Sequence, residues 1–136
     1  MRMIDVCKRF GVLSKEHNGD YISTSVIKEK FDMGLDSINI APEFGVIETQ
    51  TYIDEIGNDD TILNKFWQIC YRSEKWKKWV NSDFDPQLNK IELIKICGHY
   101  VLSTSEFIKI KSQFPDIDQK IKVNIKNKLN ELYRQK

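Results

Sequence analysis

The segment KEHNGDYIS, residues 15–23, gathers side chains that can do acid, base or ligand chemistry. A neutral imidazole such as that of His17 can transfer a proton or bind a divalent metal, zinc included. Asp20 can act beside it or hydrogen-bond a sugar hydroxyl, and Asn18 can contact a substrate. We therefore take His17 and Asp20 as candidate catalytic residues, His17 also as a candidate metal ligand, and Asn18 as a candidate for substrate binding. The structural alternative is a histidine that caps a strand end, followed by an Asn-Gly-Asp run of ordinary turn chemistry.

The segment LDSINIAPEFG, residues 35–45, ends in a second polar cluster. Glu43 can serve as a base or as a metal ligand, although an acid in the first turn of a helix is also favoured by the helix dipole. The backbone amide of Gly45 lies at the same helix start, where free N–H groups can bind a phosphate. Glu43 is thus a candidate catalytic and metal-binding residue, and Asn39 and Gly45 are candidates for substrate binding.

Both clusters follow short β-like runs, which we predict over residues 12–17 and 37–41. Between the runs, Ser23 offers an N-cap and Gly34 a helix end, so a helix joins the two strands. A strand–helix–strand connection within one sheet makes the strands parallel. In parallel α/β folds, ligands bind beyond the carboxyl ends of the strands. We therefore expect the two polar clusters to be neighbours at one end of a sheet.

The second part of the chain, residues 61–136, carries helical rather than strand periodicity. Ser103 begins a predicted capping box for one of its helices. Trp76 and Trp79 are three residues apart, which favours a core-facing or seam-facing pair over a surface that stacks nucleic-acid bases. We accordingly divide the chain into residues 1–60, with two strand–helix units, and a helical extension over 61–136.

The composition is that of a globular protein of one ordinary domain, with 136 residues, 40% hydrophobic and 30% charged. Apolar runs are far shorter than the roughly 20 residues of a membrane span, and the start lacks the apolar stretch of a signal peptide. We therefore expect a cytoplasmic protein without a membrane partner. Residues 1–60 carry six basic and twelve acidic side chains, a balance of −6, and residues 61–136 carry a balance of +7. The net charge of +1 argues against nucleic-acid binding.

The three cysteines, Cys7, Cys70 and Cys97, are widely spaced and form no CxxC pair. The last two lie among apolar and aromatic neighbours, which predicts buried, reduced thiols. The spacing disfavours both a disulfide framework and a zinc ribbon.

The two motifs together resemble a known family. KEHNGDYIS, followed about twenty residues later by INIAPEFGVIETQTYIDEI, is similar to the last two βα units of the non-catalytic subunit of class II D-tagatose-1,6-bisphosphate aldolase, the GatZ/KbaZ-like group. His17, Asp20 and Tyr21 match the first motif of that family. Ala41-Pro42 matches the second, from which Glu43-Phe44-Gly45 departs.

The resemblance implies an α/β fold, namely the C-terminal fragment of a (β/α)8 TIM barrel that lacks roughly its first six strands. It also implies an accessory subunit that supports a separate zinc-dependent aldolase, a carbon–carbon lyase, or a relative acting on another sugar phosphate. The expected partners are a catalytic aldolase subunit or further copies of the chain, with a sugar-phosphate ligand. The alternative function is a helical, partner-binding module without a ligand site of its own.

Overall fold

The computed structural model describes residues 3–134 of the chain. Their contacts divide them into two compact units. Unit 1 comprises residues 3–44 together with residues 125–134, and unit 2 comprises residues 45–124. Two helices, α3 (Pro42–Ile56) and α7 (Ile117–Tyr133), contribute residues to both units.

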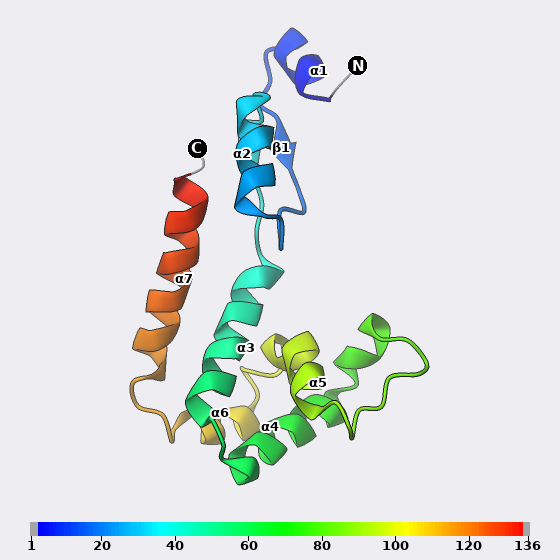
Figure 1. Cartoon of the computed structure of the whole chain (residues 1–136), viewed down its shortest axis with the longest axis vertical. Coiled ribbons are helices and arrows are strands. Elements are labelled where there is room, and N and C mark those ends of the chain that lie inside the picture. Colours follow the sequence, from blue (N-terminus) through cyan, green and yellow to red (C-terminus); the bar gives the residue numbers. More distant parts are fainter. Residues whose placement is uncertain (1–2, 135–136) are drawn as a thin grey trace. The chain divides into compact units, whose positions relative to one another are not determined.

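Unit 1 is built on a small parallel sheet and the helices that precede and join its strands (Figure 1). Its further elements are α1 (Met3–Arg9), β1 (Lys15–Glu16), α2 (Thr24–Asp32) and β2 (Ser37–Ile38). β1 and β2 pair in parallel, with Lys15 opposite Ser37 and Glu16 opposite Ile38. The predicted parallel pairing and the helix between the strands are therefore confirmed.

Helix α2 forms where its capping residues indicate. The Ser23 side chain accepts a hydrogen bond from the Val26 N–H at 3.4 Å, which satisfies one of the free amides of the first turn. Gly34 follows the helix with a φ of 96°, a left-handed conformation that glycine adopts without steric cost. Ile27, on the inner face of the helix, is 1% exposed.

The apolar core of unit 1 is small. Ile27 is the only buried apolar residue among residues 3–44 and 125–134. Phe10 and Leu13, by contrast, are 71% and 82% exposed. Hydrophobic burial within this unit is therefore slight, and its polar contacts carry more of its stability than they would in a larger core.

The predicted fold class is wrong. Helices account for 64% of the described residues and strands for 3%, so the chain is not an α/β fragment of a (β/α)8 TIM barrel with two βα units. The alternating residues over 12–17 and 37–41 favour extended backbone, but a strand also needs a hydrogen-bonded neighbour. Only residues 14–16 and 37–39 run close enough to form such bonds.

Unit 2 is helical. Besides its share of α3 and α7, it contains α4 (Asp60–Ser73), the 3₁₀ helix η1 (Lys75–Trp79), α5 (Lys90–Cys97), the 3₁₀ helix η2 (Gly98–Tyr100) and α6 (Ser105–Lys111). Figure 1 shows α4, α5 and α6 gathered in this unit. Its centre is aromatic: the Phe107 ring lies 4.8 Å from the Tyr52 ring and 4.6 Å from the Phe66 ring, centroid to centroid. All three side chains are at most 1% exposed, so this unit has a genuine core.

Local details of unit 2 confirm some predictions and correct others. Cys70 and Cys97 are buried and free, as predicted. The cap of α6 is Thr104 rather than Ser103, because the Thr104 hydroxyl accepts from the Phe107 N–H at 3.3 Å. Trp76 and Trp79 do not form a buried pair: the first is 8% exposed and the second 61%. Within residues 3–134, no helix has the length and apolar character needed to cross a membrane.

Candidate functional site

The two polar clusters meet in unit 1, as the sequence predicts. The Asp20 carboxylate oxygen Oδ1 accepts hydrogen bonds from the N–H groups of Ala41, at 3.0 Å, and Glu43, at 2.8 Å. The Gly19 N–H donates to the Asn39 carbonyl at 2.8 Å. Because Glu43 lies in the first turn of α3, Asp20 caps that helix from a distant part of the sequence.

Glu43 returns the interaction to the first turn. Its Oε2 accepts from the Tyr21 N–H at 2.9 Å. Tyr21 has a φ of 62°, a left-handed conformation that is unfavourable for a bulky residue unless its surroundings hold it. The Glu43 carboxylate supplies that support, because a hydrogen bond from an N–H group to a charged acceptor is stronger than one to a neutral acceptor.

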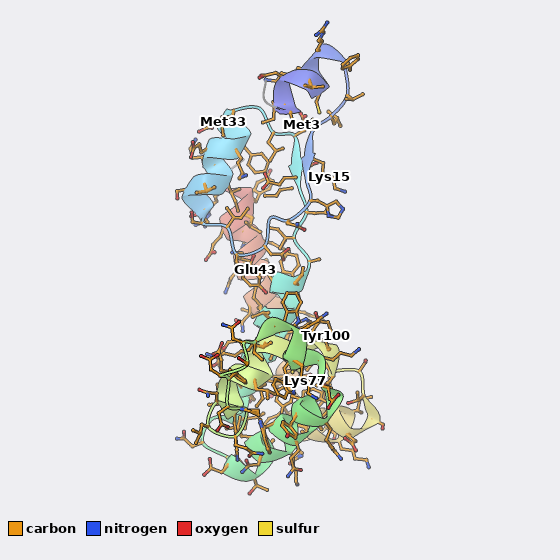
Figure 2. All side chains as sticks on the ribbon, turned by 90° about the vertical axis from the view of Figure 1, so that its right-hand side faces the viewer. Met3, Lys15, Met33, Glu43, Lys77 and Tyr100 are labelled. Carbon is orange, nitrogen blue, oxygen red and sulfur yellow. The ribbon has the colours of Figure 1, made fainter. Side chains whose placement is uncertain are left out.

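The other oxygen of Glu43 forms an ion pair with α7. Glu43 Oε1 lies 2.6 Å from Lys128 Nζ, and the two side chains are 12% and 17% exposed. A pair this well shielded from water is screened less than a surface pair. Glu43 is labelled in Figure 2, at the start of α3. We call the network of Asp20, Tyr21, Glu43 and Lys128 the carboxylate lock.

The carboxylate lock gives Asp20 and Glu43 a structural role in this chain. Both Glu43 oxygens and one Asp20 oxygen hold backbone amides or a lysine. His17 and Asn18 are exposed and are not part of the lock. Among residues 3–134, no group of three or more His, Cys, Asp and Glu side chains is arranged to hold a metal ion. The catalytic and metal-binding roles of these residues stay predictions.

Gly45 belongs to unit 2 and is not a member of the lock. Its α-carbon faces His99, and a Cβ added at Gly45 would approach the His99 Cβ to 2.8 Å. A larger residue at position 45 would therefore force the His99 side chain or the backbone beside it to shift. The His99 ring also packs on Tyr100, with 4.0 Å between centroids. Burial lowers the pKa of His99, and the nearby Lys78 ammonium lowers it further.

No family model, curated protein or solved structure matches this chain.

The residues that surround His17 form a groove along β1. The groove has a volume of about 500 Å³ and lies entirely within unit 1. Met3, Lys15 and Met33, three of its lining residues, are labelled in Figure 2. The remaining lining residues are Ile4, Cys7, Ser14, Glu16, His17, Lys30 and Leu35. Five of these ten residues are apolar, and the polar ones include Lys30 and Glu16, which form an ion pair at 2.7 Å.

Sequence reasoning missed two contributors to this region. Lys128 lies in α7, far along the chain from Glu43, and nothing near it in the sequence indicates a partner. Asp36 was also missed: its Oδ2 accepts from both the N–H and the hydroxyl of Ser14, each at 2.8 Å. An Asp that immediately precedes a predicted strand was the available signal for this second contact.

Proposed function

We propose that this chain is an accessory, partner-binding subunit, and that an extended segment of the partner adds to the free edge of β1. The observation that supports this proposal most strongly is the direction in which the N–H and C=O groups of β1 point. The Ser14 and Glu16 carbonyls accept from the N–H groups of Ser37, at 3.2 Å, and Asn39, at 2.9 Å. Because successive residues of a strand point their backbone groups to opposite sides, the N–H and C=O of Lys15 point away from β2.

The groove along β1 supports the same proposal. It is lined by four consecutive residues, 14–17. Side chains of a strand alternate between two faces, so a groove that touches four in succession runs along an edge rather than over one face. An added strand would pair with Lys15 there and place alternate side chains against Met3 and Met33, which adapt readily to different apolar shapes.

The exposed apolar residues next to β1 fit a surface that is covered in an assembly. Phe10 and Leu13 are largely exposed, and Val12 is 56% exposed. Three such residues within positions 10–13, beside an open strand edge, form an association site unless they are shielded.

The partner class comes from the motif resemblance. We propose the catalytic chain of a class II, zinc-dependent sugar-phosphate aldolase, with carbon–carbon bond cleavage and the metal supplied by that chain. The engagement of Asp20 and Glu43 in the carboxylate lock supports an accessory rather than a catalytic role here. The proposed location is the cytoplasm.

The test is co-expression with the catalytic chain of a tagatose-bisphosphate aldolase, followed by size-exclusion chromatography with light scattering. Two variants share the loss of the Lys15 charge. Lys15→Ala keeps the outward N–H, whereas Lys15→Pro removes it without breaking a bond to β2. We expect the complex to form with the native chain and Lys15→Ala and to be lost with Lys15→Pro.

Two results would contradict this proposal. Equal binding by the proline and alanine variants would exclude edge pairing. A native chain that stays monomeric beside the aldolase chain at every concentration would exclude the partner. Circular dichroism of each variant checks that the helices are intact, so that misfolding is not mistaken for lost binding.

A further inference from the structure

A groove in unit 2 lies between α4 and α6. Its volume is about 260 Å³, and its lining residues come from positions 65–72 of α4 and from positions 106–113, in and just after α6. Within each set the spacing is i, i+3, i+4, i+7, which is that of one helix face. Ile69 and Ile110 are among them and are 8% and 2% exposed, so the groove has an apolar floor.

The charged residues of this groove are mostly cations, and we call it the basic groove. Lys65, Arg72 and Lys109 face one carboxylate, that of Glu106, which gives a balance of +2. Arg72 Nη2 pairs with Glu106 Oε2 at 2.7 Å and so joins the two helices. Lys65, on α4, and Lys109, on α6, are exposed, and within residues 3–134 neither ammonium group forms an ion pair or a hydrogen bond. The basic groove therefore has a charged wall on each helix that is open to an anion.

The same unit carries a surface of the opposite charge. Residues 54–60, DEIGNDD, join α3 to α4, and four of these seven residues are acidic. Glu55 is paired with a lysine of α7. The other three, Asp54, Asp59 and Asp60, are exposed, and none of them forms an ion pair within residues 3–134. Asp54 and Asp59 accept hydrogen bonds from neutral amides, which leave their charge uncompensated. We call residues 54–60 the acidic turn.

We propose that the basic groove of one copy of this chain binds the acidic turn of a second copy. The charges are complementary: Lys65 and Lys109 lack anionic partners, and the acidic turn carries three carboxylates without cationic ones. Complementary potentials of this kind steer association and fix its register. The contact lies in unit 2, so it is separate from the partner strand proposed for β1.

Both surfaces share α4, which allows a closed dimer. The acidic turn ends at the first residue of α4, Asp60, whereas Lys65 and Arg72 lie further along the same helix. Two copies related by a twofold axis, with their α4 helices antiparallel, can place each acidic turn against the basic groove of the other copy. Nucleic acid fits the groove less well, because the Glu106 carboxylate lies in it and the net charge of the chain is only +1.

The test is sedimentation velocity of the full chain over a range of concentrations at low salt. A groove variant combines Lys65→Glu with Lys109→Glu. A turn variant combines Asp54→Lys with Asp60→Lys and leaves the Asp59 cap of α4 in place. The native chain should dimerise, with a dissociation constant that rises about tenfold or more at high salt, because exposed charges are screened. Each variant alone should dimerise at least about tenfold more weakly, and an equimolar mixture of the two should regain the dimer, because the reversed charges complement each other.

The matched control combines Lys75→Glu with Lys122→Glu. Both lysines are exposed residues of unit 2 that do not line the basic groove, and the net charge changes as much as in the groove variant. This control should dimerise as the native chain does.

A native chain that stays monomeric at low salt would overturn the proposal, as would a mixture of the groove and turn variants that stays monomeric. Dimers that nuclease treatment dissociates would assign the basic groove to nucleic acid instead. Dimers that are lost in Lys15→Pro would place the contact at the edge of β1, and either result would also overturn the proposal. Circular dichroism verifies that each variant keeps its helices.

Discussion

Replacing Glu43 by glutamine tests whether the carboxylate lock holds unit 1 together. Glu43→Gln keeps an oxygen that can accept from the Tyr21 N–H but removes the charge that Lys128 faces at 2.6 Å. The Lys128 ammonium is then left 17% exposed without its counter-ion. The matched change, Lys128→Met, leaves the Glu43 charge with the Tyr21 N–H and the first turn of α3 as partners.

The sizes of the two effects follow from this difference. Breaking a fully buried ion pair by removing one partner costs about 3–5 kcal/mol. The Glu43–Lys128 pair retains slight exposure, so we expect Glu43→Gln to destabilise unit 1 by about 2–4 kcal/mol. Lys128→Met should cost about 1–2 kcal/mol, because the remaining carboxylate keeps its amide hydrogen bond. The double variant should cost less than the sum of the two.

The assay must separate the two units. All three tryptophans, Trp67, Trp76 and Trp79, lie in unit 2, so fluorescence reports on that unit. Amide hydrogen exchange of residues 14–43 reports on unit 1. With each 1.4 kcal/mol worth a factor of ten, Glu43→Gln should accelerate this exchange by about thirtyfold to a thousandfold. The tryptophan melting curve should stay unchanged.

Either of two outcomes would show that the carboxylate lock does not stabilise unit 1. Exchange over residues 14–43 that stays within about threefold of the native rate in Glu43→Gln would show that the pair contributes little. Strictly additive single and double variants would show that Glu43 and Lys128 do not act on each other.

Two further predictions concern unit 2. Because burial lowers the pKa of His99, the unfolded chain binds a proton there more readily, and stability should fall as the pH drops below about 6.5. His99→Leu should lose this fall in tryptophan-monitored melts; an unchanged slope would exclude His99 as its source. Gly98→Ala should destabilise unit 2 by about 1–3 kcal/mol, because the new Cβ would come within 2.4 Å of the buried Thr49 Cγ2. Urea unfolding by fluorescence measures this, and a native midpoint would refute the close contact.

The parallel pairing in unit 1 was predictable because local signals agreed. The Ser23 cap and the glycine at position 34 define a helix between two extended segments, and that connection favours a parallel pair. The barrel fragment was not a sound conclusion, because an alternating run records a preference for extended backbone and not the presence of further strands. Only a few residues on either side of Lys15 and Ser37 find a partner within the described chain.

The proximity of the candidate site residues was likewise predictable, but their roles were not. Polar groups after parallel strands converge, so Asp20 and Glu43 were expected to be neighbours. Whether a carboxylate is available for catalysis depends on which hydrogen-bond donors and cations of the folded chain already contact it. Here Glu43 is held by the Tyr21 amide, in a left-handed turn, and by the distant Lys128. No residue close to Glu43 in the sequence indicates either contact.

The most direct measurement of the proposed function is the hydrogen exchange of the Lys15 amide, alone and with the aldolase catalytic chain. The Lys15 N–H points away from β2, so it should exchange fast in the free chain. If a partner strand pairs with this edge, the amide should become strongly protected in the mixture, while the Glu16 amide, directed toward β2, changes less. A Lys15 amide that exchanges equally fast with and without the partner would contradict the account.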